Sequence, residues 1–326
     1  IRDRSVSRGL GDVYKRQAGC LGYSLYHQLH AHGIDCVILA PTTMMTKPGK
    51  RIKTDRRDAR LISKCLAFHT YSPVYIPTEV DDAVKEYIRM RDDANSALAR
   101  VKQQIIAFCI RHGKIHDGKS YWTNKHLEWL SSLDLGNKIL SEVLQEYLIR
   151  YYQLREQVDM YDMRINELAQ AEPYRQKVEK LGCFRGIAAH TALSFCVEVG
   201  DFRRFATAQQ FASYLGLVPG ECSSGDKQQY TGITKAGNSH LRKLLVETAQ
   251  VFGRSATKSG KSVALKERQA KCDSLTVAYA DKANARLKKK YFKIAMRSKV
   301  NIAKTAVARE MACFIWGMMT DNISCA

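Results

Sequence analysis

The sequence lacks three features that would each assign it to a class of protein. No two of its ten cysteines form a CxxC pair, which argues against a zinc knuckle and is typical of buried thiols in a reducing cytoplasm. No apolar run approaches the ~20 residues needed to cross a bilayer, and even residues 311–319 fall short. The first basic residues lead into no apolar stretch, unlike a signal peptide. We therefore expect a cytoplasmic protein without a membrane partner.

Acidic residues are also scarce relative to basic ones. The 326 residues include 52 Lys and Arg against 32 Asp and Glu, which leaves a net charge of +20. Such an excess favours an anionic partner, and nucleic acid is the usual one, although ribosomal and membrane-surface proteins share this composition. Because 45% of the residues are hydrophobic, the chain can bury a substantial core. The composition therefore indicates a folded protein that binds nucleic acid.

The first segment, residues 1–17, has the sequence IRDRSVSRGLGDVYKRQ and neither helical nor strand periodicity. It is similar to a translated sequencing adapter, and we expect it to be non-native and outside the fold. The alternative is a basic, flexible arm that binds backbone phosphates.

Residues 18–80 have the pattern of an α/β layer. A helical pattern ends at Gly33, and residues 35–40 form a short apolar run of the kind seen in buried parallel strands. The basic loop 42–54 then leads into a helix that begins near Asp55. We expect this region to be a fragment of a sheet-based domain.

Residues 81–172 change to apolar positions that step by threes and fours. From Leu140 to Leu168 a seven-residue repeat persists for about four heptads, which predicts a coiled coil. Two long helices separated by a loop near residues 112–136 would form an antiparallel hairpin, or an arm that pairs with another subunit. A homo-oligomer is therefore a plausible expectation.

Residues 173–326 are predicted to form a compact helical domain. Residues 178–199 read as two short helices separated by a turn at Gly186, a pattern that suits a helix-hairpin-helix element holding a phosphate at a helix N-terminus. The polar segment 220–227 is predicted to be a loop. The densely basic residues 258–309 keep helical periodicity, so we expect basic helices there.

The helix after this loop has a predicted cap and a predicted core face. Asn238 or Ser239 is expected to cap its N-terminus. Its apolar face is predicted to consist of six residues: Leu241, Leu244, Leu245, Thr248, Ala249 and Phe252.

Asp55 and Asp58 are candidate metal ligands. Their spacing places both carboxylates on one face of a helix, where they can share a divalent cation such as Mg²⁺. The simpler interpretation is a solvated charge cluster at a helix start, where Asp favours the helix dipole.

Ser224 is a candidate nucleophile, because it lies in a polar loop with Lys227, Lys235 and Arg242 nearby in sequence to stabilise a phosphoryl group. The simpler interpretation is a turn serine that bonds its own backbone. No histidine is adjacent in sequence to serve as a base, and His190 and His240 are interpreted as packing or capping residues.

Four segments together resemble one known family. They are AGCLGYSLYHQL at 18–29, KTDRRDAR at 53–60, FRGIAAHTALSFCVEVGDFRRF at 184–205 and YLGLVPGECSSGDKQQYTGITKAGNSHLRKLLVETA at 214–249. The sequence resembles the DEDD transposases of the insertion sequence one-ten family over nearly everything after Gln17.

The resemblance implies an α/β plus α fold, with a truncated RuvC-like (RNase H-like) domain, a coiled-coil insertion and an all-helical C-terminal domain. In the family, four carboxylates bind Mg²⁺, and the last two fall on Asp55 and Asp58. The catalytic serine falls on Ser224, with Ser223 the weaker match. The resemblance also implies cutting and rejoining of double-stranded DNA by a homo-oligomer, with an element-encoded guide RNA choosing the DNA partners.

Basic residues beside these two sites are expected to bind nucleic acid. They are Lys53, Arg56, Arg57, Lys227, Lys235, Arg242 and Lys243.

The sequence departs from the family at its start. The family's Glu would fall on Gln17, and its first Asp belongs to a strand further upstream. Losing two of four anionic ligands should weaken a magnesium site, so we expect the chain as written to be inactive and its full-length parent to be active.

Two other functions remain open at this point. A structure-selective junction nuclease would use water as its nucleophile, and Ser224 would then be dispensable. A non-catalytic basic protein would hold DNA or RNA by phosphate contacts alone, with steep salt dependence and no strand cleavage.

Overall fold

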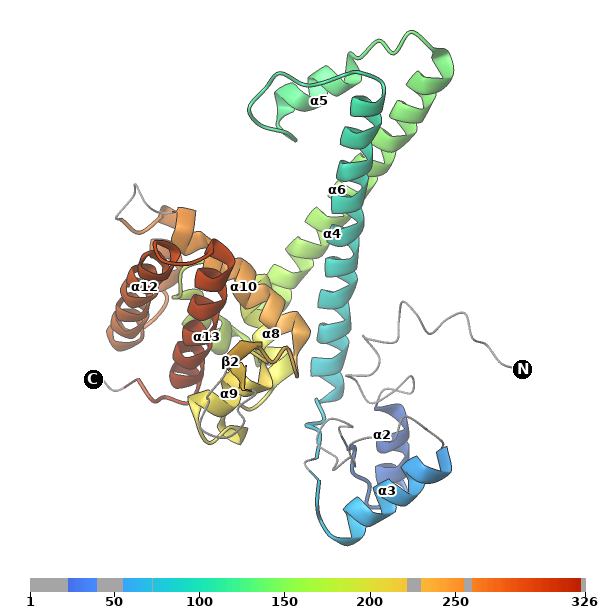
Figure 1. Cartoon of the computed structure of the whole chain (residues 1–326). Coiled ribbons are helices and arrows are strands. Elements are labelled where there is room, and N and C mark those ends of the chain that lie inside the picture. Colours follow the sequence, from blue (N-terminus) through green and yellow to red (C-terminus); the bar gives the residue numbers. More distant parts are fainter. Residues whose placement is uncertain (1–22, 40–54, 72, 222–229, 255–259, 324–326) are drawn as a thin grey trace. The chain divides into compact units, whose positions relative to one another are not determined.

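A computed structural model describes residues 23–39, 55–71, 73–221, 230–254 and 260–323 (Figure 1). The chain forms two compact units, residues 1–78 and residues 79–326. In the described residues nearly all regular structure is helical. Among the described helices, none combines the length and the apolar character that a bilayer span requires.

The first unit contains two described helices, α2 (Ser24–Ala31) and α3 (Asp55–Ala67). As predicted, α2 ends just before Gly33, whose φ of 72° is a conformation that glycine adopts without strain. Also as predicted, a helix begins at Asp55.

The predicted buried parallel strand at residues 35–40 does not form within the described part of this unit. Residues 35–38 form no regular strand, and the only strand-type pairing described there is an isolated antiparallel bridge between Leu39 and Pro73. Val37 remains 42% exposed. A buried strand requires a neighbour on each side and a layer over each face, and the described residues of this unit provide no such sheet.

The second unit begins with two long helices, α4 (Glu79–Arg111) and α6 (Lys138–Gln170), which pack side by side and run in opposite directions (Figure 1). The short helix α5 (Asn124–Ser131) lies in the connection between them. The predicted antiparallel pair is therefore confirmed, whereas a coiled-coil supercoil stays a prediction. The seam between the helices and α5 buries Leu98, Val101, Ile105, Phe108, Cys109, Leu127, Leu130, Leu144, Leu148, Tyr151 and Val158.

The rest of the second unit is a helical body. Its elements are α7 (Arg175–Gly182), α8 (Ala189–Val199), the 3-10 turn η2 (Phe202–Arg204), α9 (Ala208–Tyr214), β1 (Pro219–Glu221), β2 (Tyr230–Ile233), α10 (Ser239–Arg254), α11 (Val263–Gln269), α12 (Ser274–Ala295) and α13 (Val300–Met319). Helix α13 packs against α9, α10 and α12. The basic C-terminal segment is therefore helical, as its periodicity predicts.

Local sequence determines three features of this body. The side-chain oxygen of Asn238 accepts a hydrogen bond from the backbone N–H of Leu241 at 3.0 Å, so Asn238 is the predicted cap of α10. The six apolar residues predicted to face the core are the six that α10 buries. Helices α7 and α8 are separated at Gly186, whose φ of 86° permits the predicted turn.

Candidate functional site

The segment that carries Ser224 joins two paired strands. Residues 222–229, which include Ser224 and Lys227, lie outside the described residues. On either side, β1 and β2 form an antiparallel pair in which Pro219 lies opposite Ile233 and Glu221 lies opposite Tyr230. The candidate serine is therefore in the connection of a β-hairpin, a feature that the sequence prediction of a polar loop did not include.

The base of this hairpin is closed by two glycines. The backbone N–H of Lys235 donates to the carbonyl of Gly216 at 3.1 Å, and that of Asn238 donates to the carbonyl of Tyr214 at 2.9 Å. A Cβ at Gly237 would lie only 2.1 Å from the Tyr214 carbonyl oxygen, and Gly237 has a φ of 80°. The close approach therefore requires glycine and ties the end of α9 to the start of α10.

Arg242 reinforces the same base. Its Nη1 donates to the carbonyls of Leu215 at 2.8 Å and Ala236 at 3.3 Å. This part of the guanidinium is used to position backbone. Of the other predicted nucleic-acid ligands in this unit, Lys235 is exposed, and the exposed Lys243 lies 4.0 Å from Glu247.

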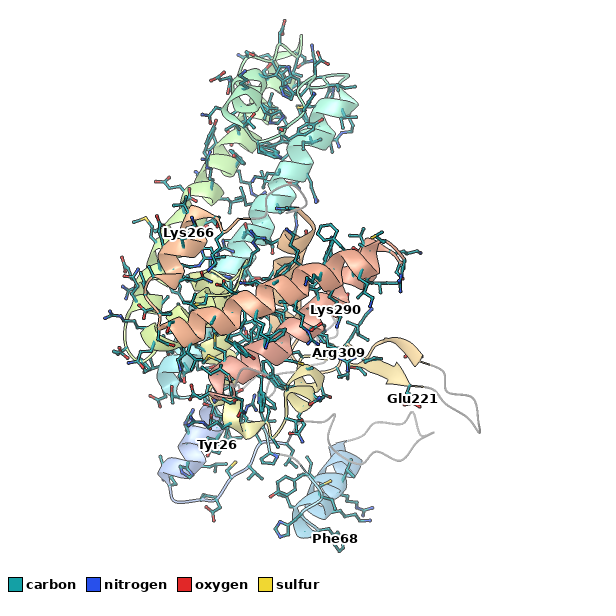
Figure 2. The ribbon with its side chains drawn as sticks, turned by 90° about the vertical axis from the view of Figure 1, so that its left-hand side faces the viewer. Tyr26, Phe68, Glu221, Lys266, Lys290 and Arg309 are labelled. Carbon is teal, nitrogen blue, oxygen red and sulfur yellow. The ribbon has the colours of Figure 1, made fainter. Side chains whose placement is uncertain are left out.

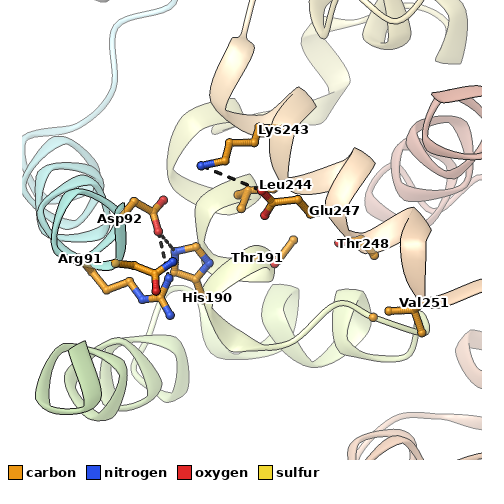
Figure 3. Close-up of a pocket in the computed structure, with 11 residues that line it drawn as sticks. Arg91, Asp92, His190, Thr191, Lys243, Leu244, Glu247, Thr248 and Val251 are labelled. Atoms are coloured by element: carbon orange, nitrogen blue, oxygen red, sulfur yellow. Dashed lines mark hydrogen bonds and ion pairs between the residues drawn. The ribbon is translucent and has the colours of Figure 1, made fainter. Parts of the chain in front are cut away.

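A partly buried ionic network is linked to the hairpin base through Asn238. His240 Nε2 is 2.7 Å from Asp92 Oδ2, and His240 Nδ1 is 2.6 Å from Glu198 Oε1. The Asn238 side-chain amide donates to the other Glu198 oxygen. His190 Nε2 is 3.0 Å from Asp92 Oδ1, a contact drawn in Figure 3. The network therefore joins α4, α8 and α10.

The charge states of this network follow from its geometry. An imidazole ring with a carboxylate at each nitrogen can satisfy both only when both nitrogens carry protons. Burial alone would lower the pKa of His240, but the hydrogen bonds to Asp92 and Glu198 outweigh it and raise this pKa to about 9. Burial would raise the pKa of both carboxyl groups, yet hydrogen bonds from the histidines lower each one. The network therefore consists of a histidinium between two carboxylates.

Beside the network, residues of α4, α8 and α10 line a partly open polar cavity of about 290 Å³. Its lining carries both signs of charge, with Arg91 and Lys243 opposed by Asp92 and Glu247 (Figure 3). Arg91 is already held by Asp162 through contacts of 2.7 and 2.9 Å. Within the described residues, no group of three or more His, Cys, Asp or Glu side chains is arranged to hold a metal ion.

The candidate metal ligands lie in the first unit. Asp55 and Asp58 both lie at the start of α3, so the backbone gives them the predicted i,i+3 relation on one helix face. Their side chains, and those of Arg56 and Arg57, are outside the described residues, as is Lys53. Aspartate supplies the hard oxygen donors that Mg²⁺ prefers, so these two residue types fit that ion.

Sequence reasoning missed the buried network. Asp92 and Glu198 were not singled out, and His240 was interpreted only as a packing or capping residue. His240 lies 148 residues from Asp92 and 42 from Glu198 in sequence. At such separations no local motif connects the three side chains, and only the folded helices bring them together.

The raised pKa of His240 predicts a pH-dependent stability. With an unfolded pKa near 6.5, this histidine contributes its full stability below about pH 6.5 and loses it as pH rises through about 9. We expect the free energy of unfolding to fall by roughly 2–3 kcal/mol between these limits. Urea denaturation at a series of pH values measures it. If the free energy of unfolding of His240→Gln falls equally steeply with pH, the pH dependence comes from other groups.

Comparisons with known proteins connect both units to one group of enzymes. The model of a transposase family described as DEDD_Tnp_IS110 matches residues 13–110, and that of the transposase IS116/IS110/IS902 family matches residues 179–269. A protein of Sinorhizobium fredii named as a transposase is 35% identical over 94% of this chain and 74% of its own length. The transposase for insertion sequence element IS1533 of Leptospira borgpetersenii is 33% identical over 84% of this chain and 80% of its own length.

Proposed function

Since this chain belongs to the IS110 family of insertion-sequence transposases, which act on DNA, we propose how its residues carry out the reaction. It cuts and rejoins double-stranded DNA by phosphoryl transfer, with Ser224 as the nucleophile and with Asp55 and Asp58 as ligands of Mg²⁺. It works as a homo-oligomer, and an element-encoded RNA selects the DNA partners.

The observation that carries this proposal is the closed base of the hairpin. Strand pairing holds Glu221 and Tyr230, the residues that flank 222–229, and the close approach of Gly237 to Tyr214 closes the base of the hairpin. A nucleophile must approach phosphorus along a defined line, so a connection with anchored ends suits a reactive serine better than a free loop does. Arg242 contributes by holding the backbone at this base, and Lys235 supplies an exposed positive charge beside it.

The proposed chemical step balances without an external energy source. The Ser224 hydroxyl oxygen forms a bond to phosphorus while one bridging P–O bond of the DNA strand breaks. The serine proton is released, and the departing sugar oxygen gains a proton. The phosphodiester is replaced by a serine phosphodiester of the same bond type, so a second sugar hydroxyl can reverse the step and rejoin a strand.

Mg²⁺, when bound, supplies Lewis-acid stabilisation of the charge on the phosphoryl oxygens. Asp55 and Asp58 would hold it as two ligands from one turn of α3. The basic side chains near each site, Lys53, Arg56, Arg57, Lys227 and Lys243, would bind the backbone of the same DNA.

Replacing either metal ligand tests the metal part of the proposal. We expect Asp55→Asn and Asp58→Asn each to raise the Mg²⁺ concentration needed for half-maximal recombination by tenfold or more, since even the outer partners of metal ligands change affinity about 10–100-fold. The measurement is formation of the recombined junction from a plasmid carrying the element with its non-coding flanks, in cells and then with purified protein across Mg²⁺ concentrations.

Two comparisons make this assay decisive. The chain is assayed beside a version whose residues 1–17 are exchanged for the N-terminal sequence of the Sinorhizobium fredii relative, and whichever version recombines DNA is the reference. Asp117→Asn and Asp134→Asn, each made as a single variant, remove the same charge as the α3 variants at exposed positions remote in sequence. They should leave the Mg²⁺ requirement unchanged. An unchanged requirement in both α3 variants would remove Asp55 and Asp58 from the metal site.

A further inference from the structure

Helix α12 carries a row of exposed basic side chains that neither family match covers. The matches end at residues 110 and 269, and α12 begins at Ser274. Lys282, Arg286, Lys289 and Lys293 are all exposed and recur at spacings of four, three and four residues. This spacing places them on one face of the helix, which we call the basic face of α12.

The opposite side of α12 fixes the orientation of this face. Ala280, Ala283, Leu287 and Tyr291 are buried, and α12 packs against α13 and α10. The buried side chains hold the helix against the body and leave the four basic residues exposed to solvent. Figure 2 shows the side chains that project from α12 and α13, with Lys290 and Arg309 labelled.

Little negative charge is available to neutralise this face. No acidic residue occurs in the sequence between Asp281 and Glu310. Glu310 of α13 pairs with Arg286 and with Lys290, and its side chain is only 10% exposed. In the described part of the chain, Lys289 and Lys293 contact no carboxylate. Lys289 and Lys293 therefore keep a net positive charge on this face of the helix.

We propose that the basic face of α12 is a binding site for the sugar-phosphate backbone of nucleic acid. The proposal rests on the proposed function, because it identifies a surface that would hold the substrate of that reaction. Lys282 and Lys293 are separated by about 16 Å along the helix axis at 1.5 Å per residue. That distance matches about five phosphates of one DNA strand at ~3.4 Å each.

The side chains of the face also indicate how it binds. Three of the four are lysines, which act as point charges and discriminate poorly between bases, whereas base reading commonly uses the fork of Arg or the amide of Asn or Gln. Phosphate contacts position a protein on the backbone without reading the sequence. The face therefore contributes sequence-independent affinity.

Salt-dependent binding tests this site separately from catalysis. The triple variant Lys282→Gln, Lys289→Gln, Lys293→Gln retains Arg286 and its pair with Glu310. Binding to a duplex DNA of arbitrary sequence and to an RNA hairpin is measured in EDTA, so that no metal-dependent step contributes. We expect the slope of log affinity against log salt to become shallower by about 2–3 on the preferred nucleic acid, at about 0.9 per lost contact for duplex DNA and somewhat less for RNA. The affinity near 0.1 M salt should fall on the order of tenfold to a hundredfold.

The matched control removes the same charge elsewhere. Lys119, Lys125 and Lys138 are exposed residues around α5 and the start of α6, and their replacement by Gln should leave both slopes unchanged. A changed slope with DNA alone assigns the face to DNA, and a changed slope with RNA alone assigns it to RNA. The proposal is overturned if the two triple variants lose affinity equally. It is also overturned if the α12 variant keeps its helical circular dichroism and loses no affinity. If a Ser224 variant fails to recombine DNA but binds nucleic acid with the same salt dependence as the unmodified protein, the proposed binding site is retained although the proposed nucleophile is not needed for it.

Discussion

Ser224→Ala is expected to abolish strand exchange while leaving DNA binding intact. Removing the hydroxyl removes the atom that forms the bond to phosphorus, and losing the nucleophile of a covalent mechanism lowers the rate by roughly 10⁴-fold or more. Junction formation should fall below detection in the plasmid assay. Because the described backbone hydrogen bonds of the hairpin base join other residues, affinity for DNA in EDTA should change little.

Ser223→Ala is the matched control for this experiment. It removes the same atoms from the neighbouring position of the same connection, so it reports any general damage to residues 222–229. We expect it to retain recombination. Normal exchange by the Ser224 variant would mean that water or another group attacks the DNA, which is the behaviour of a junction nuclease. If only the Ser223 variant loses recombination, the nucleophile is Ser223 and not Ser224.

His240→Ala is expected to produce the largest loss of stability. The substitution removes the cation between Asp92 and Glu198, and the Glu198 side chain is only 4% exposed. Breaking a fully buried ion pair by removing one partner typically costs about 3–5 kcal/mol, because the remaining charge stays buried without compensation. The side chains of His240 and Asp92 are 20% and 21% exposed, so we expect a loss at the lower end of this range, about 3 kcal/mol. Urea denaturation near pH 7, where His240 is protonated and both carboxyl groups are ionised, measures the full effect.

The pH dependence of this loss identifies its cause. Above about pH 9 the native histidine is itself neutral, so the difference between the two proteins should shrink. Lys243→Ala, an exposed position on the same helix, should change stability by less than about 0.5 kcal/mol. A loss of the same size at every pH would indicate a packing defect and not a missing charge.

The sequence pattern predicted those elements that are specified by residues close to one another in the chain. The buried face of α10 follows from a 3.6-residue period, and its cap follows from the preference for Asn at that position. The paired helices α4 and α6 follow from a long heptad-like repeat. In each case the residues that specify the element lie within a few turns of one another.

Features that depend on distant residues were not predictable in this way. Strands β1 and β2 contain only three and four residues, and Pro219 and Gly220 resemble a turn and not a strand. Residues 35–40 have the composition of a buried strand. Whether such a segment joins a sheet depends on neighbouring strands, which cannot be identified from the segment itself. The histidinium network likewise arises only where α4, α8 and α10 meet.

That network also has a consequence for how such genes can exchange parts. Asp92 lies in the stretch matched by one family model, whereas Glu198 and His240 lie in the stretch matched by the other. A crossover between two diverged elements in the intervening region would combine a carboxylate from one parent with an imidazole from another. The hybrid would be stable only where both parents carry compatible partners, so these two stretches should be inherited together.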